Sequence, residues 1–313
     1  VHGSRGLGDV YKRQIKGWSS EIILSCFIVG GVFLLAFVTW ESKAKRPLLD
    51  LSVFKDRSVR SGSLSLLVQF TVAFGFFFVA VQFIAYVLGY GPLDTGLSFL
   101  PTAIGLFPAS LIAIPLTKKL GFRVTGLLGL CLLGVSLYVG AQFQSDSSFL
   151  DFALVAVIYG AGIGLASPPA TEIIVSSLPF EKQGVASALN DVLRELGAVI
   201  GIAIAGSMFN SGYRSSIDSL QEFPQEILEL AKESPAIAPQ LASSLETSMD
   251  NFLYQITVSV AEGWSDSLWA LLFVVAGGAV CFAIWAPGKK QQARAIVSSR
   301  SGRTALRYEE VAT

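Results

Sequence analysis

Residues that can carry charge or exchange protons gather in one apolar stretch of the sequence, residues 184–201. Asp191 and Glu195 stand four positions apart, about one helical turn, so their carboxyl groups lie on one face of a helix. Asn190 and Arg194 occupy the neighbouring stripe, and Arg194 is within reach of Asp191. An ionisable group inside a membrane helix costs roughly 2.5 to 3.5 kcal/mol on insertion scales, so each one indicates a function. We expect Asp191 and Glu195 to face a cavity and carry protons, with Arg194 and Asn190 as further candidates for coupling to protons or substrate. The alternative is a static ion cluster that fixes helix packing.

The same stretch carries small residues at a spacing that brings membrane helices together. Gly197 and Gly201 continue the stripe of Asn190 and Arg194. Their Gly-x-x-x-Gly spacing lets a partner helix approach closely through backbone contact. We therefore predict a role in helix packing for these two glycines and for Gly184, which begins the stretch.

Two consecutive prolines precede this stretch. Pro168 and Pro169 lack backbone donors, so we expect them to kink or break a helix and to free carbonyl groups at membrane depth. Glu172 lies one turn beyond them and is interpreted as a cavity acid, with a position at the membrane surface as the alternative. The glycines before the prolines do not form a Gly-x-Gly-x-x-Gly motif and no strand precedes them, which excludes a nucleotide-binding loop.

An aromatic wall with a few amide groups is expected between residues 69 and 82. Phe74 and Phe77 lie between Gln69 and Gln82, and these four residues are predicted to line a cavity together with Pro168 and Pro169. Such a wall suits a lipophilic or cationic guest, because the face of an aromatic ring attracts quaternary ammonium groups. Ordinary helix packing and exposure to lipid explain the phenylalanines equally well.

Several classes of function are excluded by composition. His2 is the one histidine, so the sequence has no Ser-His-Asp triad, Cys-His dyad or histidine metal cluster. Cys26, Cys131 and Cys281 lie in apolar runs without Cys-x-x-Cys spacing, and no disulfide, metal or cofactor is expected. The 23 Lys and Arg residues balance 23 Asp and Glu residues, which argues against a nucleic-acid partner. The sequence therefore does not predict an enzyme.

The elements that must position these residues are membrane helices. Hydrophobic residues make up 52% of the 313 residues and charged residues 15%, whereas soluble domains average about 25% charged. A bilayer core of about 30 Å needs about 20 apolar residues in a helix, and a continuous run of that length has no other way to satisfy its backbone. The fold class is therefore predicted to be all-α, a polytopic bundle of seven transmembrane helices at residues 22–40, 62–87, 96–117, 124–143, 152–175, 185–209 and 265–286.

Basic residues predict the orientation of these helices. With the loop after the first span on the cytoplasmic side, sixteen Lys and Arg residues fall on that side, and beyond the first span only Arg214 and Lys232 fall on the other. This bias predicts a cytoplasmic C-terminus in a bilayer-embedded, multi-pass protein.

The segments between the spans complete the expected organisation. Residues 1–14 form a leader that we interpret as non-native, because they show neither a signal-peptide core nor any periodicity that continues into residue 15 and beyond. We expect residues 15–60 to form a single span with an amphipathic cytoplasmic connector, and residues 61–209 to form five spans. Residues 210–263 are predicted to form an acidic extracytoplasmic loop with amphipathic helices, residues 264–287 the last span, and residues 288–313 a flexible basic tail.

Four motifs make the sequence similar to a known family. They are Pro47-Leu-Leu-Asp-Leu-Ser-Val-Phe-Lys55, Leu88-Gly-Tyr-Gly-Pro-Leu-Asp-Thr-Gly96, Pro168-Pro-Ala-Thr-Glu172 and Gly184-Val-Ala-Ser-Ala-Leu-Asn-Asp-Val-Leu-Arg-Glu-Leu-Gly197. With these motifs the sequence resembles the C-terminal half of a fourteen-span drug/proton antiporter of the major facilitator superfamily, the EmrB/QacA type. The resemblance extends over nearly all of residues 15–286.

The resemblance implies a fragment of a secondary active efflux transporter in the bacterial cytoplasmic membrane. Such a protein exchanges amphipathic or cationic small molecules, among them drugs, for protons, and its partner here is the N-terminal half of the same protein. The first residue is Val and the predicted span number is odd, which agrees with a missing first half. The family places carboxylates in the stretch that matches residues 190–195, so a proton or cation role is transferred to Asp191 and Glu195. Export of a metabolite or natural product, and a membrane scaffold that transports nothing, are the alternatives.

Overall fold

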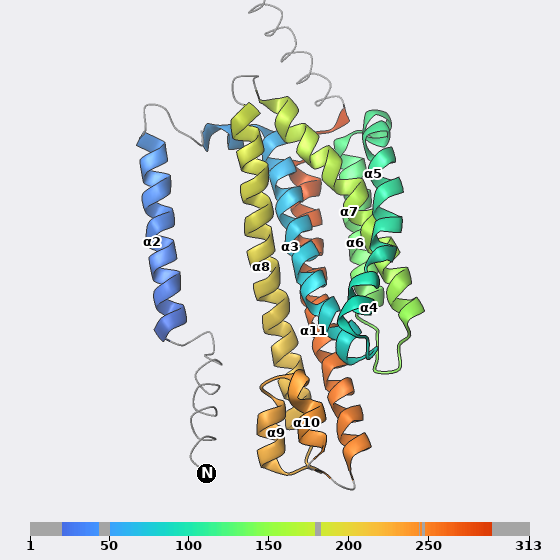
Figure 1. Ribbon diagram of the computed structural model, residues 1–313. Coiled ribbons are helices and arrows are strands. Elements are labelled where there is room, and N and C mark those ends of the chain that lie inside the picture. Colours follow the sequence, from blue (N-terminus) through green and yellow to red (C-terminus); the bar gives the residue numbers. More distant parts are fainter. Residues whose placement is uncertain (1–20, 44–50, 179–182, 244, 246–247, 290–313) are drawn as a thin grey trace, which may run out of the picture. The chain divides into compact units, whose positions relative to one another are not determined.

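The structure is a computed structural model that describes residues 21–43, 51–178, 183–243, 245 and 248–289. Every regular element within these residues is a helix, as predicted (Figure 1). The chain divides into two compact units, residues 1–52 and residues 53–313.

The first unit contains helix α2 (Glu21–Lys43), and the short 3-10 helix η1 (Leu51–Lys55) follows at its boundary with the second unit. The predicted span at residues 22–40 lies within α2. Within the described residues, six helices are long and apolar enough to cross a membrane, and the seventh predicted span is not confirmed.

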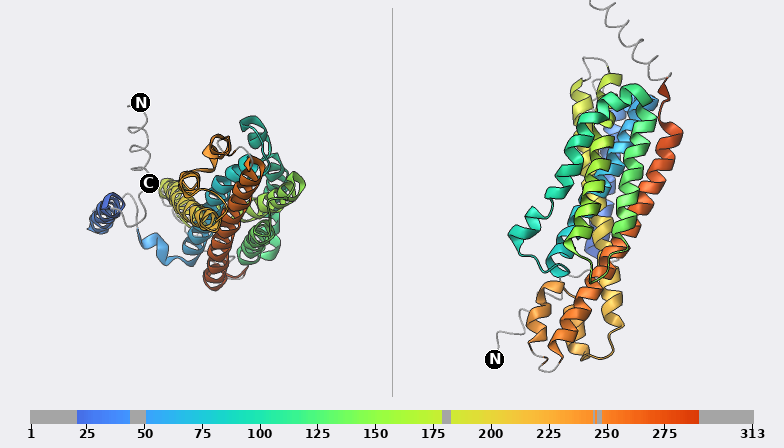
Figure 2. Two further views of the ribbon diagram at one scale, coloured as in Figure 1. Left: turned by 90° about the horizontal axis from the view of Figure 1, so that it is seen from below. Right: turned by 90° about the vertical axis from the view of Figure 1, so that its right-hand side faces the viewer.

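The second unit is a bundle that contains these six helices (Figures 1 and 2). The short helix α4 and helix α5 together make one of the six, Pro92–Leu120, and a group of short helices separates the last two. The elements are α3 (Arg57–Tyr86), α4 (Pro92–Leu97), α5 (Leu100–Leu120), α6 (Phe122–Gly140), α7 (Phe149–Ser177), α8 (Gln183–Asp218), α9 (Gln225–Ala231), η3 (Pro235–Ile237), α10 (Ala238–Ala242) and α11 (Met249–Trp285).

Local sequence signals set the starts of two of these helices. The carboxylate of Asp56 accepts hydrogen bonds from the backbone of Ser58 and Val59 at 2.6 and 3.3 Å, which caps α3. Ser148 and Asp151 form a reciprocal capping box at the start of α7. Both caps satisfy backbone donors that have no partner inside the helix.

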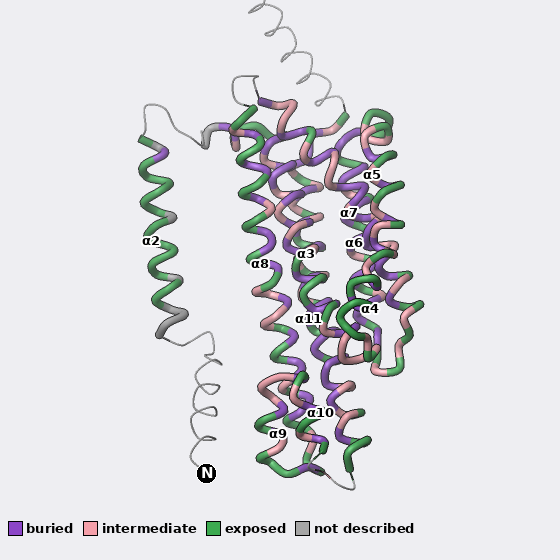
Figure 3. Tube along the Cα trace, viewed as in Figure 1, coloured by how far each residue is buried: buried purple, intermediate pink, exposed green. Residues whose placement is uncertain are grey.

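Helix α3 lies at the centre of the bundle and contacts α7, α8 and α11. Buried residues gather where the helices face one another (Figure 3). In this core the ring of Phe76 stacks on Tyr159 of α7 at 4.2 Å between centroids, and Trp264 of α11 lies beside it at 5.7 Å. The indole nitrogen of Trp264 donates to the carbonyl of Gly140, which ties α11 to α6. Aromatic contacts and this hydrogen bond therefore join four helices of the bundle.

Glycines bring two pairs of helices into backbone contact. Gly197 and Gly201 of α8 lie against α3, where a Cβ atom on Gly201 would collide with the carbonyl oxygen of Thr71. Gly105 of α5 and Gly160 of α7 make the equivalent contact between those helices, each against the backbone of the other. In both pairs, residues further along one helix contact residues further along the other, so the two helices of each pair run parallel. The third glycine predicted to pack is different: Gly184 is exposed at the start of α8, and no neighbour approaches it.

One end of the bundle carries most of the described basic side chains, and we call it the basic end. Here Arg57 of α3 donates to the carbonyls of Ile284 and Trp285 at 3.0 and 3.3 Å, and Lys289 donates to the carbonyl of Lys119 at 2.7 Å. Cationic side chains are favourable at helix C-termini, where carbonyls lack partners inside the helix. These bonds hold the ends of α3, α5 and α11 together.

The opposite end carries a helical cap, residues 210–263. The sequence predicts separate amphipathic helices here, flanked by spans that end at residue 209 and begin at residue 265. In the structure α8 instead continues to Asp218 and α11 already begins at Met249, so both spans extend into the cap. The apolar pattern stops at the membrane surface while the helices continue, because the cap has its own core. Within it Tyr213 donates to the carbonyl of Ala231 at 2.8 Å, and Phe223 packs edge-on against Phe252.

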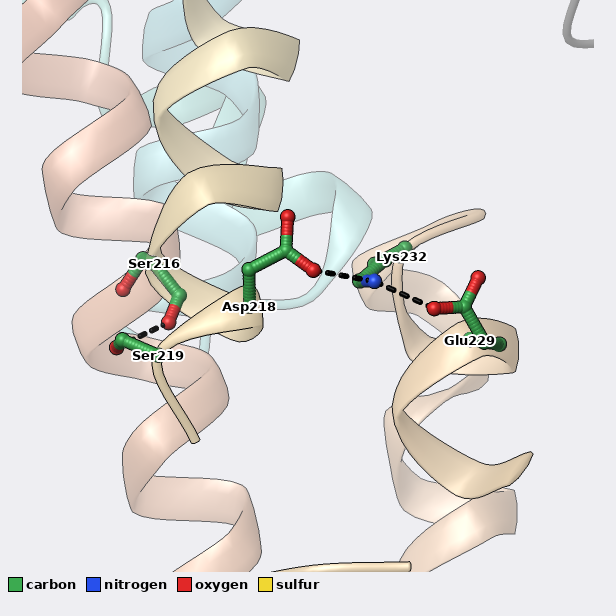
Figure 4. A network of polar contacts seen from close by, with 5 residues as sticks. All are labelled: Ser216, Asp218, Ser219, Glu229 and Lys232. Atoms are coloured by element: carbon green, nitrogen blue, oxygen red, sulfur yellow. Dashed lines mark hydrogen bonds and ion pairs between the residues drawn. The ribbon is translucent and has the colours of Figure 1, made fainter. Parts of the chain in front are cut away.

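A three-residue network closes the cap between α8 and α9 (Figure 4). The ammonium group of Lys232 contacts the carboxylate of Asp218 and lies 2.5 Å from that of Glu229. The hydrogen bond to Asp218 and then that to Glu229 raise the pKa of Lys232 above its usual value. The network therefore stabilises the cap only while Lys232 holds its proton.

We expect Gly201→Ala to destabilise the bundle and Gly277→Ala to stabilise it slightly. A methyl group on Gly201 meets backbone atoms of Thr71 that cannot move aside, and overpacking of this kind typically costs about 1–3 kcal/mol. Gly277 of α11 has nothing within 4 Å of the added methyl group, so the variant gains about 0.5–1 kcal/mol of helix propensity. Thermal unfolding of both variants in detergent measures the difference, and equal unfolding temperatures would contradict the close contact of α3 with α8.

The contribution of Lys232 to stability should be present at neutral pH and disappear at high pH. Because its pKa is raised in the folded protein, the contribution is complete below the unfolded-state pKa of about 10.4 and is lost as the pH rises through the folded-state value. Exposed ion pairs contribute about 0.2–1 kcal/mol, so the effect is small. Unfolding of the wild type and Lys232→Met, compared from pH 8 upward, tests this. A difference that is unchanged after the lysine has lost its proton would contradict it.

Candidate functional site

The sequence-predicted site residues lie on three helices, and α3 stands between the other two. Its residues Gln69, Phe74, Phe77 and Gln82 are flanked by α7 on one side and by α8 on the other. The prolines and Glu172 belong to α7, and residues 190–195 belong to α8. The three helices therefore bring the predicted residues to one region of the bundle, but not all onto one surface.

Arg194 points into the bundle, toward α3 and α7. Its guanidinium carbon lies 5.2 Å from the centre of the Phe70 ring, and its terminal nitrogen donates to the hydroxyl of Thr171 at 3.4 Å. Its Nε atom is buried without a partner. Within the described part of the chain, Arg194 forms no ion pair, so its charge is not neutralised by Asp191 three positions away.

The carboxylates of α8 lie on a different face of that helix. Asp191 and Glu195 are exposed, and they share this open face with apolar residues such as Val192 and Val199, which are 48% and 66% exposed. Asn190, by contrast, is only 4% exposed; its Nδ2 donates to the carbonyl of Ala186 at 3.0 Å, and its Oδ1 has no partner. Helix α8 therefore presents its amide and guanidinium inward and its two acids outward.

The double proline does not break α7. The helix runs without interruption from Phe149 to Ser177, with Pro168 half-buried and Pro169 buried inside it. Proline fixes φ near −65°, which is compatible with a helix, so what it removes is the backbone donor. The expected break is therefore wrong, whereas the kink, the other form of that expectation, stays a prediction. Glu172, near the end of α7, is exposed.

The two glutamines of α3 differ from the predicted cavity wall. Gln69 is fully buried; its Nε2 donates to the hydroxyl of Ser65 at 2.7 Å and its Oε1 has no partner. It lies in the interior because α3 is surrounded by α7, α8 and α11. Gln82 is half-buried near the other end of the helix. Gln69 is thus a residue of the bundle interior and does not line an open wall.

The phenylalanines form an open aromatic stripe along α3, and we define it as Phe70, Phe74 and Phe77. Phe74 and Phe77 are 43% and 37% exposed. The rings of Phe70 and Phe74 lie 6.3 Å apart, and Phe77 packs against Phe99 at 4.9 Å. The stripe begins beneath the guanidinium of Arg194 and ends near the start of α5.

Thr171 is the site residue that the sequence did not indicate. Its hydroxyl contacts Arg194, which is 23 positions away in the chain. The only local signal is its position between Pro169 and Glu172, and that does not reveal a contact with another helix. In the described part of the chain, no group of three or more His, Cys, Asp or Glu side chains is arranged to hold a metal ion.

A bundle of this kind, with inward polar groups on parallel helix pairs, agrees with the comparison with known families. A family model described as the Major Facilitator Superfamily matches residues 11–202. The chain belongs to the major facilitator superfamily. The predicted resemblance is confirmed, and because the superfamily consists of transporters, the chain is not an enzyme.

Curated relatives within this superfamily are named for drug efflux or resistance. The multidrug efflux pump LfrA of Mycolicibacterium smegmatis is 30% identical over 226 residues, which cover 72% of this chain and 45% of that protein. The multidrug resistance protein Stp of Mycobacterium tuberculosis is 29% identical over 203 residues, 64% of this chain and 37% of Stp. The methyl viologen resistance protein SmvA of Salmonella typhimurium is 28% identical over 236 residues, 75% of this chain and 48% of SmvA. The chain thus spans less than half the length of each of these three relatives.

Cysteine labelling should separate the two faces of α8. With Cys26, Cys131 and Cys281 replaced by serine, Asp191→Cys and Glu195→Cys in proteoliposomes should react with a membrane-impermeant maleimide at least about tenfold faster than Asn190→Cys. The reactive thiolate forms only where water reaches the side chain, and Asn190 is buried whereas the two acids are exposed. Gln69→Cys, which is fully buried, is the second unreactive control. Equal labelling at all four positions would contradict this assignment of faces.

Proposed function

We propose that the chain is the C-terminal part of a secondary active efflux transporter that exchanges amphipathic or cationic small molecules for protons. Membership of the superfamily and similarity to multidrug efflux pumps support transport of small molecules. The observation that carries the proposal is the open face of α8, where Asp191 and Glu195 are exposed one turn apart.

Two acids on an exposed face of a membrane helix need an explanation. Facing hydrocarbon, a charged carboxylate costs roughly 2.5 to 3.5 kcal/mol, so this face belongs against water or against other protein. Transporters of this superfamily hold substrates near the midplane between two bundles. A second bundle, with a water-filled cavity between it and α8, therefore accounts for the exposed acids. The chain spans less than half the length of each of the three relatives, which leaves room for such a bundle.

The proposed membrane topology places the basic end in the bacterial cytoplasm. The excess of Lys and Arg at this end follows the positive-inside rule, and the acidic cap then lies outside the membrane. On this topology the C-terminus is cytoplasmic, and α2 is a further span ahead of the bundle. A proton that enters down a potential of 100 mV supplies about 2.3 kcal/mol, which suffices with a pH gradient to drive modest accumulation outside.

Neutral variants of the two acids should lose proton-driven transport in the complete protein. In proteoliposomes, Asp191→Asn and Glu195→Gln are expected to abolish efflux of methyl viologen driven by an imposed pH gradient, because neither amide can release a proton. Glu226→Gln in the cap, outside the proposed cavity, should transport normally.

The chain on its own provides a further control. Residues 15–313 without the other bundle should insert but exchange nothing, because the cavity needs both bundles. If both acid variants transport normally in the complete protein, Asp191 and Glu195 do not carry protons. If the wild type inserts normally and shows no flux of any tested small molecule, the scaffold alternative is favoured.

A further inference from the structure

We propose that Arg194 binds the carboxylate of an aromatic amphipathic substrate whose body lies along the aromatic stripe of α3. This inference rests on the proposed function and adds to its substrate class amphipathic molecules that carry an acidic group. The site consists of Arg194, Asn190 and Thr171 at one end of the stripe formed by Phe70, Phe74 and Phe77.

The first observation is a cation without a counter-charge. The guanidinium of Arg194 is half-buried over Phe70, with a single long hydrogen bond, 3.4 Å, to the neutral hydroxyl of Thr171. Its Nε–H group is buried and has no acceptor among the described residues. The ion pairs in the described residues of the bundle and cap all involve Lys232, far from this site. A guanidinium that is partly withdrawn from water is stabilised by an opposite charge with good hydrogen bonds, which this part of the chain does not supply.

The acids closest in sequence do not fill this role. Asp191 and Glu195 lie on the exposed face of α8, and Glu172 is exposed beside Thr171. None of the three forms an ion pair within the described residues. The unpaired guanidinium is thus free to receive an acidic group from a bound molecule.

A second unpaired polar group lies one turn away. The side chain of Asn190 is 4% exposed, and its Oδ1 has no partner among the described residues. One of the two N–H groups of its Nδ2 donates to the carbonyl of Ala186. Asn190 and Arg194 are four positions apart on one face of α8, so their polar ends are neighbours. Both side chains therefore have hydrogen-bonding capacity left inside the bundle, at the place where a guanidinium could take a carboxylate in bidentate geometry.

The aromatic stripe defines the rest of the ligand. From Phe70 to Phe77 the helix rises about 10 Å, close to the length of a three-ring aromatic system. Phe74 and Phe77 are 43% and 37% exposed, so their rings are available to a flat molecule. Because Arg194 lies at the Phe70 end, a molecule on the stripe would present its carboxylate at that end and its apolar or cationic part toward Phe77.

A matched pair of dyes tests the proposal on the complete protein in lipid nanodiscs. Tetramethylrhodamine carries a free carboxylate, and its methyl ester carries one more methyl group in place of that charge. Fluorescence anisotropy without any proton gradient gives the Kd of each dye. We expect the wild type to favour the acid over the ester, and Arg194→Gln to reduce that preference at least tenfold, or about 1.4 kcal/mol.

Arg214→Gln is the matched control. Arg214 lies on the same helix and also has a buried Nε without a partner, but it is 20 residues away, about 30 Å along α8. The Arg214→Gln variant should leave the preference for the acid over the ester unchanged. Arg194→Lys should retain part of the preference, because lysine keeps the charge but not the bidentate geometry. If Arg194→Gln does not fold, Arg194→Lys and Thr171→Val provide the comparison, and each should reduce the preference.

Three results would overturn the proposal. The first is a wild-type protein that binds neither dye, or binds both with the same Kd. The second is a preference for the acid that persists in the Arg194 variants. The third is an equal loss of affinity for both dyes in Arg194→Gln. The last result assigns Arg194 to a contact with the other bundle. The proposed function fails separately if the protein transports no methyl viologen while its preference for the acid dye over the ester still depends on Arg194.

Discussion

The bundle depends on the close approach of backbones at a few glycines. Within a membrane the hydrophobic effect does not drive helices together, so association relies on van der Waals contact and hydrogen bonds between surfaces that fit. Gly201 meets the Thr71 carbonyl on α3, and Gly160 meets α5 in the same manner. These two contacts hold α8 against α3 and α5 against α7, and they set the rotation of each helix about its axis.

That rotation decides which residues of α8 can meet α3. Gly197 lies against Phe70, so Arg194, one turn before Gly197 on the same stripe, is placed over the Phe70 ring. Successive residues turn by about 100°, which carries Asp191 and Glu195 onto the open face. The packing glycines thus separate the cation from the acids. A static cluster in which Arg194 neutralises Asp191, one of the alternatives raised by the spacing, is not the arrangement in this structure.

The sequence predicts what the membrane dictates and misses what depends on contacts between helices. Six of the predicted spans coincide with helices that are long and apolar enough to cross a membrane, because a long apolar run must satisfy its backbone within itself. The ends of α8 and α11 are misplaced because the helices outlast the apolar pattern and continue into the cap. The burial of Gln69 and the contact of Arg194 with Thr171 follow from the neighbours of α3, which no local pattern reveals. Of the kink or break expected at Pro168, the break is absent, since α7 is continuous through both prolines.

The separation of charges on α8 also bears on how the two proposals relate to each other. The proposed proton carriers, Asp191 and Glu195, and the proposed carboxylate ligand, Arg194, belong to one helix but face different surroundings. Protonation of Asp191 or Glu195 therefore leaves the charge of Arg194, the group that would bind a substrate carboxylate, unchanged. Coupling between the two sites would have to pass through movement of α8 as a body, because a rigid helix changes both faces together. The glycine contacts with α3 are then the surface on which such a movement takes place, and they join the packing of the bundle to its proposed transport.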